Sequence, residues 1–303
     1  MKRLRLGHRV AVVAVAVLVL GYGVLHYHHL DVLLWKSWRL NSQTMPEQAL
    51  NLGRYRVEID ARVVEGVDDD LSALTYNSER NTLFSVLNGQ PVVVELSLEG
   101  ELLRWIPVSG VRDMEGLTHV EGDLYVIAEE RTQRLMLAQI TDTTESLDLS
   151  AVPSLTLALD QVGNKGFEGL SWDDEAQRLL VVKERQPLRL LAVEGFVHST
   201  AGDLLDIRIS ELKASDSRRL FMRDLSSLTA HSESGHLLLL SDESRMLVEY
   251  DDQGRPLSLL GLWRGMHGLA RSVPQAEGLA IDSQGRIYIV SEPNLFYRFV
   301  PGD

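Results

Sequence analysis

A five-fold internal repeat limits what this chain can fold into. A five-residue motif that ends in leucine recurs at intervals of 43 to 58 residues, and the polar run after each copy leads into short apolar stretches separated by turn residues. The copies are DLSAL at 70–74, DMEGL at 113–117, GFEGL at 166–170, DLSSL at 224–228 and QAEGL at 275–279. Short apolar runs between turn residues are typical of β-strands. About four strands per repeat predict a β-propeller, because one such sheet cannot bury both of its faces alone.

The number of blades follows from the copies and from one further strand. The last copy has only three strands before Asp303, whereas 55–64 (YRVEIDARVV) has the pattern of a strand that precedes the first copy. That strand can complete the last sheet and close the ring, which protects the sheet edges. We therefore predict an all-β domain over 54–303, a five-bladed propeller closed by an N-terminal strand. Six blades are the alternative, if a degenerate blade lies in the longer spacers.

The N-terminus predicts a single transmembrane helix. Residues 10–25 carry no charge, and four Lys or Arg side chains precede them. A bilayer core needs about 20 apolar residues, so we expect the anchor to cover 10–35 with aromatic groups at its end. The basic segment 1–9 then stays in the cytoplasm, and 36–53 is a polar tether to a propeller on the far side of the membrane. In a bacterium this would be a propeller in the periplasm, anchored in the inner membrane through residues 10–35. A cleaved signal peptide is the alternative, although no small-residue cleavage site follows the apolar run.

The charge of the chain excludes one class of partner. The formal net charge is -13, and because residues 1–40 carry +5, the remainder carries about -18. Phosphate contacts need a basic surface, so we expect no nucleic acid partner. The chain has no cysteine, which excludes a disulfide scaffold.

Aligning the repeats places carboxylates at equivalent heights of the expected channel. The position two residues before the repeat leucine holds Glu115, Glu168 and Glu277, with Ser72 and Ser226 in the other two copies. The first strand of a blade lines the channel, so these glutamates should converge. Acids held close together cannot all ionise without a counterion, and a hard divalent cation with oxygen ligands supplies one. The sequence therefore predicts calcium bound by the three glutamates, with magnesium less favoured.

Polar residues at the end of each second strand form a candidate second ring. The second strand adjoins the first, so we expect them to surround the glutamates. They are Asn88, Glu129, Glu184, Asp242 and Glu292. Lys183 and Arg185 lie beside them and could hold a small anionic substrate against the cation. The alternative is structural: these acids pair with neighbouring basic residues, and Asp70, Asp113 and Asp224 cap turns, which is the interpretation favoured for these three.

Longer segments resemble a known family. NKGFEGL at 164–170, LLLLSDES at 237–244 and SEPNLFY at 291–297 are similar to the SdiA-regulated proteins of Gram-negative bacteria, and the resemblance covers roughly 54–300 and the anchored N-terminus. It implies a periplasm-facing propeller linked to calcium and related to phytase-like and esterase-like propellers, without one settled reaction. Lactonase-type propellers bind an axial calcium through a Glu-Gly glutamate with Asn and Asp. The loose counterparts are Glu115, Asn88 and Asp242, of which Glu115 alone matches by motif.

Three functions fit these features. The leading one is a calcium-binding, membrane-anchored propeller with a binding or calcium-homeostasis role in the periplasm. The second is a calcium-dependent hydrolase of phosphate esters, lactones or carboxyl esters, with Glu129, Glu184 or Glu292 as the base. The sequence contains no GxSxG motif, which disfavours a serine nucleophile, and the Asp-rich loops of a phytase are not evident. The third is a protein-interaction scaffold with a structural metal.

Overall fold

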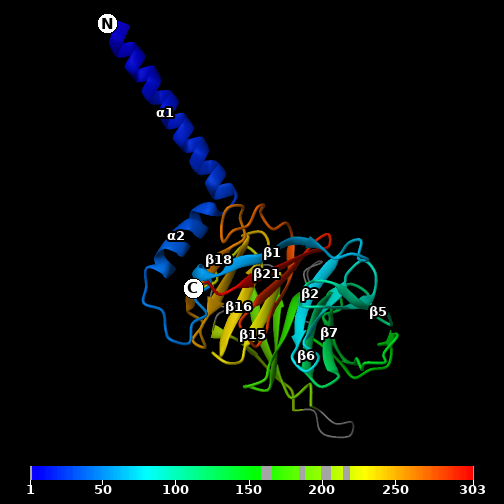
Figure 1. The fold of residues 1–303 in the computed structure, drawn as a ribbon. Coiled ribbons are helices and arrows are strands. Elements are labelled where there is room, and N and C mark those ends of the chain that lie inside the picture. The colour runs from blue at the N-terminus through cyan, green and yellow to red at the C-terminus, as the bar shows by residue number, and fades with distance from the viewer. Residues whose placement is uncertain (1, 158–165, 184–187, 199–205, 214–218, 303) are drawn as a thin grey trace.

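Five antiparallel sheets make up the propeller (Figure 1). The computed structural model describes residues 2–157, 166–183, 188–198, 206–213 and 219–302. The first blade holds β2 (Leu71–Asn77), β3 (Thr82–Leu87), β4 (Val92–Leu96) and β5 (Leu102–Ser109), with β9 (Leu147–Asp148) added beyond β5. The second holds β6 (Met114–Glu121), β7 (Leu124–Glu129), β8 (Arg134–Gln139) and β10 (Ser154–Thr156). The third holds β11 (Phe167–Asp173), β12 (Arg178–Lys183), β13 (Arg189–Glu194) and β14 (Arg208–Glu211).

The last two blades show how the ring closes. The fourth holds β15 (Ser227–His231), β16 (His236–Ser241), β17 (Met246–Tyr250) and β18 (Pro256–Gly261). The fifth holds β19 (Ala276–Ile281), β20 (Ile287–Ser291), β21 (Leu295–Val300) and the N-terminal β1 (Arg56–Val63). β1 pairs antiparallel with β21, from Arg56 opposite Val300 to Val63 opposite Leu295. The prediction of five blades closed by an N-terminal strand is confirmed, and no sixth blade is needed.

Each pair of neighbouring blades shares one apolar core. The buried side chains fall into five clusters, and each cluster combines strands of two adjacent blades. The run LLLL at 237–240 in β16 shows why the strands are so apolar: Leu237 and Leu239 pack toward the third blade, while Leu238 and Leu240 pack toward the fifth. A strand that is buried on both faces needs apolar residues at every position, not at alternate ones.

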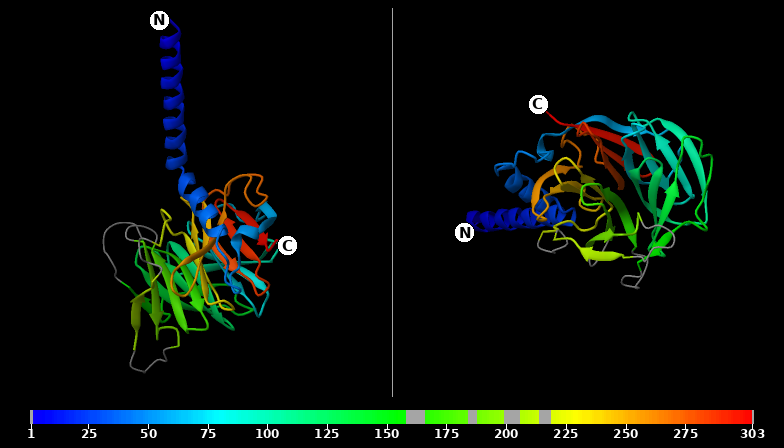
Figure 2. Two further views of the ribbon diagram at one scale, coloured as in Figure 1. Left: turned by 90° about the vertical axis from the view of Figure 1, so that its left-hand side faces the viewer. Right: turned by 90° about the horizontal axis from the view of Figure 1, so that it is seen from below.

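A row of hydroxyl groups joins the inner strands. β2, β6, β11, β15 and β19 contact one another in a closed ring, which is visible end-on in Figure 2. In three successive pairs of blades, a hydroxyl oxygen of one inner strand accepts a backbone N–H of the next over 2.9–3.0 Å: Thr75 from His119, Thr118 from Trp172, and Ser171 from Ala230. In the first three blades, the residue directly after the repeat leucine is therefore an inter-blade hydrogen-bond acceptor.

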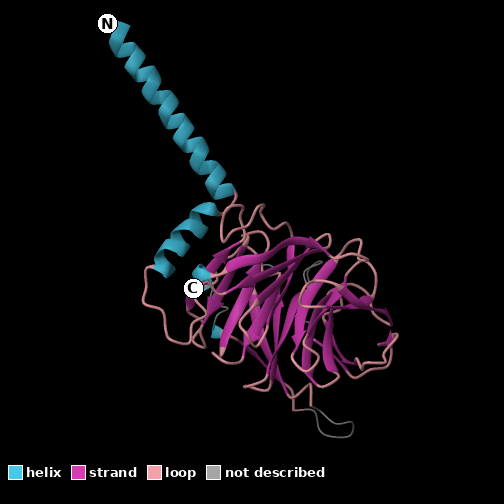
Figure 3. Ribbon diagram, in the orientation of Figure 1, coloured by secondary structure: helices cyan, strands magenta, loops and turns pink. Residues whose placement is uncertain are grey.

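Two helices precede the propeller (Figure 3). α1 (Lys2–Tyr27) contains an 18-residue segment from Val10 to Tyr27 that is long and apolar enough to cross a membrane, and none of it is buried. α2 (Leu30–Asn41) packs against β18, with Leu33 and Leu40 in the core shared by the third and fourth blades. The sequence analysis expected a span over 10–35 and a tether over 36–53. In the structure the apolar helix ends at Tyr27, and a second helix over Leu30–Asn41 lies on the propeller. After α2, the short 3-10 helix η1 (Leu52–Arg54) leads into β1.

Candidate functional site

The three repeat glutamates are extra residues of β-bulges. In β6, Met114 pairs with Glu129 and Gly116 pairs with Ala128, so Glu115 between them has no partner on β7. β11 and β19 shift in register in the same way at Glu168 and Glu277. A bulge changes the direction of a side chain relative to the normal alternation of a strand. The repeated Glu-Gly pair is therefore the sequence signal of a bulge at the start of an inner strand.

The glycines after these glutamates allow adjacent blades to approach closely. A Cβ atom on Gly278 would lie 2.6 Å from the carbonyl carbon and oxygen of Ala73 in the first blade. A Cβ atom on Gly116 would lie 2.8 Å from Leu170 in the third blade. Distances below 3.0 Å require a neighbour to move, and the backbone of a ring of sheets has little freedom to do so. The bulges and the glycines together bring the starts of β6, β11 and β19 close to the neighbouring blades.

Glu115 links the first two blades by hydrogen bonds. Ser72 Oγ donates to its Oε2 at 2.6 Å, and the Asn88 side-chain amide donates to its Oε1. The side chain is 8% exposed. The pKa of Glu115 is raised to about 7, chiefly by burial and also by the negative charges of Glu130 and Glu292, while the Ser72 hydrogen bond opposes the shift.

Glu277 is the most strongly perturbed acid of the site. Its pKa is raised to about 9, first by burial and then by the nearby carboxylates of Asp242, Glu115 and Glu292 in that order. The carboxyl group of Glu277 is therefore protonated at neutral pH, unless a positive charge lies close to it. A bound cation is the simplest source of such a charge.

By strand register, Glu130 rather than Glu129 occupies the position equivalent to Asn88 and Glu292 of the second ring. In three blades, the backbone N–H of the residue after the second strand donates a hydrogen bond to the carbonyl oxygen at the start of the repeat, over 2.9–3.2 Å. The pairs are Asn88 to Asp70, Glu130 to Asp113, and Glu292 to Gln275.

The side chain of Glu129 has other partners. It accepts hydrogen bonds from the Arg112 N–H at 2.9 Å and from the Thr132 hydroxyl, and its Oε2 lies 3.4 Å from Nε of Arg134. These contacts give Glu129 the structural role of a loop cap and ion-pair partner. Two glutamates are adjacent at this strand end, so the sequence alone does not show which of them is equivalent to Asn88 and Glu292.

The other predicted members of the second ring differ in their surroundings. Asp242 Oδ1 accepts the Ala276 N–H at 3.2 Å, which ties the fourth blade to the fifth beside Glu277. Lys183 is 3% exposed at the end of β12, opposite Phe167 and next to the bulged Glu168 in register. It brings a buried positive charge to the third blade. Glu184 and Arg185 lie outside the described residues.

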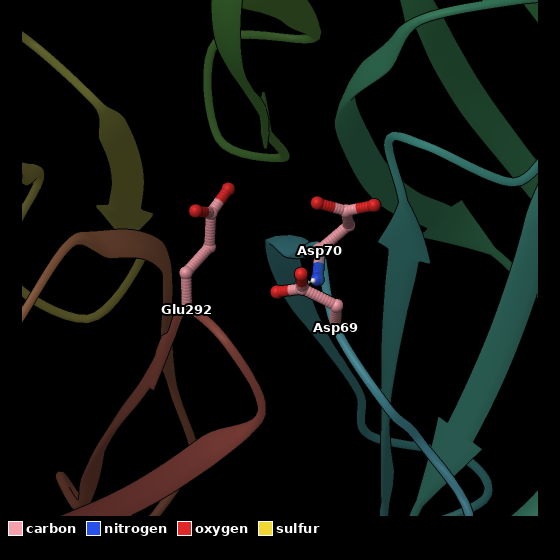
Figure 4. A group of neighbouring side chains, drawn as sticks. All are labelled: Asp69, Asp70 and Glu292. Atoms are coloured by element: carbon pink, nitrogen blue, oxygen red, sulfur yellow. Dashed lines mark hydrogen bonds between the residues drawn. The ribbon is translucent and has the colours of Figure 1, made fainter.

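A compact acidic cluster lies where the ring closes. Asp69 and Asp70 precede β2, Glu292 follows β20, and one carboxylate oxygen of each lies within 4.8 Å of the others. Asp69 is exposed, whereas the other two are partly buried. Figure 4 shows that the carboxylates of Asp70 and Glu292 extend into the same space between the two loops. Within the described residues, this is the one set of three acids that satisfies that distance; the bulged trio of Glu115, Glu168 and Glu277 does not.

Charge repulsion is concentrated in this cluster. The pKa of Glu292 is raised by burial and then by the negative charges of Asp70, Asp69 and Asp242. Asp69 Oδ1 accepts the backbone N–H of Asp70 at 2.9 Å, and Asp70 has a φ of 64°, a left-handed conformation that aspartate tolerates better than most residues. The sequence analysis assigned Asp70 to turn capping and did not single out Asp69.

The other two aspartates at the start of the repeat have structural partners. Asp113 forms an ion pair with Arg131 at 2.8 Å. Asp224 accepts hydrogen bonds from the Ser241 hydroxyl and, at 3.2 Å, from the Glu243 N–H, and burial raises its pKa to about 6. These contacts agree with the interpretation that Asp113 and Asp224 stabilise loops.

Comparisons with known proteins agree with this architecture. A family model described as SdiA-regulated matches residues 47–300. The fold is similar to glutaminyl cyclase from Myxococcus xanthus, with 12% identity and a TM-score of 0.53 over 81% of this chain and 95% of that one. It is also similar to a luciferin-regenerating enzyme, with 11% identity and a TM-score of 0.47 over 82% and 97% of the two chains.

A eukaryotic propeller gives a weaker likeness. The β-propeller domain of Cps50 (Swd1) from Myceliophteria thermophila has 10% identity and a TM-score of 0.42, over 76% of this chain and 65% of that one. Identities this low concern the fold alone. The family model, in contrast, covers the whole propeller and the residues just before it, so this chain belongs to the SdiA-regulated family.

Proposed function

We propose that this protein is a membrane-anchored propeller that binds calcium at the acid-lined end of its channel and has a binding or calcium-homeostasis role in the periplasm. The observation that carries the proposal is the cluster of Asp69, Asp70 and Glu292, whose carboxylate oxygens lie close enough to share one ion. Near it are Glu277 and Glu115, whose pKa values are raised first by burial and then by neighbouring carboxylates that include Glu292. A divalent cation in the cluster would lower this repulsion.

The donor atoms favour calcium over softer metals. All three members of the cluster offer carboxylate oxygens, and calcium takes about six to eight oxygen ligands, including water. Zinc and copper sites are built largely from histidine and cysteine, and the chain has no cysteine. Asp69 is exposed, so water can complete the ligand set. Magnesium is less favoured because it demands a more regular octahedral site.

Contacts at the end of α1 support a retained anchor. Arg223 donates hydrogen bonds from its two Nη atoms to the carbonyl oxygens of Tyr27 and His26, at 2.7 and 2.8 Å. The last carbonyls of a helix lack partners within the helix, and a cation there is favourable. A cleaved signal peptide would leave Arg223 without these acceptors. The contacts also place α1 at the same end of the propeller as Asp224, which follows Arg223 directly.

Calcium binding is tested by titrating the purified full chain, stripped with a chelator, and by measuring its melting temperature. We expect calcium to raise the melting temperature, and the double variant Asp70→Asn/Glu292→Gln to bind at least about ten-fold more weakly because it loses two anionic ligands. Glu65→Gln/Asp68→Asn is the matched control, since it removes two charges from exposed positions near Asp69. Equal affinity in both double variants, or no binding by the wild type, would contradict the proposal. The same variants test catalysis. If the wild type cleaves aryl esters, lactones or phosphate esters only with calcium, and Asp70→Asn/Glu292→Gln does not cleave them, the site is catalytic.

A further inference from the structure

The second helix has an apolar face that the propeller does not cover. On one side of α2, Leu33 and Leu40 are buried against the propeller. On the other side, Leu34, Trp35 and Trp38 have exposed fractions of 50%, 57% and 64%. The two indole rings lie 5.3 Å apart between centroids. We propose that this face lies on the bilayer surface, with both tryptophans among the lipid headgroups; the inference rests on the proposed anchor role of α1.

Hydrogen bonding fixes the direction in which the exposed face points. Asp31, Trp35 and Trp38 are spaced four and three residues apart, so they form one stripe along the helix. Asp31 Oδ2 accepts a hydrogen bond from Nδ1 of His26 in the last turn of α1, at 2.9 Å. The stripe therefore begins on the side of α2 that faces α1. Figure 1 shows that the two helices meet at a sharp bend, so this side of α2 is turned toward the membrane that α1 would cross.

The junction between the helices is attached to the propeller at several points. His29, which has a φ of 57° at the start of α2, lies with its Nδ1 3.0 Å from the hydroxyl oxygen of Ser244. Arg223 bonds to the end of α1, and the ring of His28 packs edge-on against Trp263 with centroids 5.6 Å apart. Because α2 is also held through its buried leucines, it cannot turn its tryptophans away from the bilayer without breaking these contacts.

The bilayer fits this face better than another protein does. Only His28 and His29 separate α2 from α1, so a helix that spans the membrane brings α2 directly to the membrane surface. Tryptophan is enriched at this depth because its ring is apolar and its N–H can bond to water or headgroups. Arg39 is exposed on the same helix and can reach lipid phosphates.

This placement has a consequence for the acidic cluster. Arg223 and Ser244, which hold the helix junction, are next to Asp224 and two residues from Asp242 in the chain. The acid-lined end of the channel therefore faces the bilayer, while the pocket lined by His119 and Trp172 opens on the opposite end. Cations that gather near anionic headgroups would meet the acidic end first.

The lack of native cysteine allows a direct test. Trp38→Cys and, as the matched control on an exposed tryptophan of β5, Trp105→Cys are each labelled with a nitroxide in the full chain reconstituted in nanodiscs of phosphatidylcholine and phosphatidylglycerol. We expect oxygen, which concentrates in lipid, to relax the label at 38 several-fold more than a water-soluble nickel complex does, and the reverse at 105. Leu34→Cys gives the same measurement at a second position of the face.

The outcomes separate this inference from the anchor proposal. If labels at 34 and 38 are as accessible to nickel as the label at 105, while the protein resists extraction from vesicles by alkaline carbonate, the role of α2 is wrong and the anchor stands. If carbonate extracts the protein, the anchor itself fails and the inference fails with it. A label at 38 that becomes protected only at high protein concentration would mean that a second copy covers the face, which also overturns the inference.

Discussion

Without divalent cations, the protein is expected to become less stable as the pH rises from 7 to 9. The cause is Glu277, whose folded-state pKa is raised to about 9 from an ordinary value of 4.5. Between these values the folded chain keeps a proton that the unfolded chain has released, so the free energy of unfolding falls as the pH increases. The loss is about 1.4 kcal/mol per pH unit for one group. Because the group is half ionised at pH 9, the two pH units correspond to about 2 kcal/mol in total, or a fall of roughly 4–8 °C in melting temperature for a domain of this size.

The measurement is thermal unfolding of the full chain in detergent with a chelator, at several pH values. Starting at pH 7 avoids most of the opposite contribution of the buried histidines, such as His119 and His231, whose lowered pKa values make stability rise with pH below their ordinary value of 6.5. Glu277→Gln should remove most of the slope, because its side chain is neutral at every pH. Added calcium should also flatten it, since a cation beside Glu292 lowers the pKa of Glu277. If stability falls equally with pH in the wild type and in Glu277→Gln, Glu277 is already ionised in the folded chain at neutral pH without a bound cation, and the prediction is wrong.

The fold could be predicted because its signal occurs five times. No single strand identifies a propeller, but the leucine motif and the paired apolar runs recur in every copy, and the unpaired strand before the first copy fits the gap in the last. The hydroxyl row was missed for a related reason. Thr75, Thr118 and Ser171 occupy equivalent positions in the sequence, yet their bonds cross between blades and depend on the distance between sheets.

The site was predicted only in outline. The Glu-Gly column pointed to the channel end, but periodicity does not show a bulge, and bulges decide where Glu115 and Glu277 point. The predicted closure makes the first and fifth blades neighbours, but the close approach of Asp70 to Glu292 could not be predicted from the sequence. These residues are 222 positions apart and meet only because the first and fifth blades are neighbours after closure. Similarly, α2 looked like part of an anchor until its leucines were seen in the propeller core.

Gly278→Ala is expected to destabilise the propeller strongly. The new Cβ would lie 2.6 Å from the carbonyl carbon and oxygen of Ala73, which are backbone atoms of the adjacent blade. Neither blade can move away without opening the apolar core between them, so we expect a loss of about 3 kcal/mol or more. Urea unfolding of the full chain in detergent, followed by tryptophan fluorescence, measures it.

Two further variants keep this prediction testable if Gly278→Ala does not fold. Gly116→Ala places its Cβ 2.8 Å from a side-chain atom of Leu170, which can adjust, and 2.9 Å from the Cβ of Ala128, which moves only with its backbone. Its three nearest neighbours include no backbone atom of the adjacent blade, so its loss should be smaller, about 1–3 kcal/mol. Gly122→Ala is the control: nothing lies within 4 Å of its Cβ, and only its φ of 52° costs stability, by about 1 kcal/mol. The expected order of stability is Gly122→Ala above Gly116→Ala above Gly278→Ala. If Gly278→Ala were as stable as Gly122→Ala, close approach of the blades would not be the reason for a glycine at position 278. The backbone conformation of the bulge would then be the remaining reason.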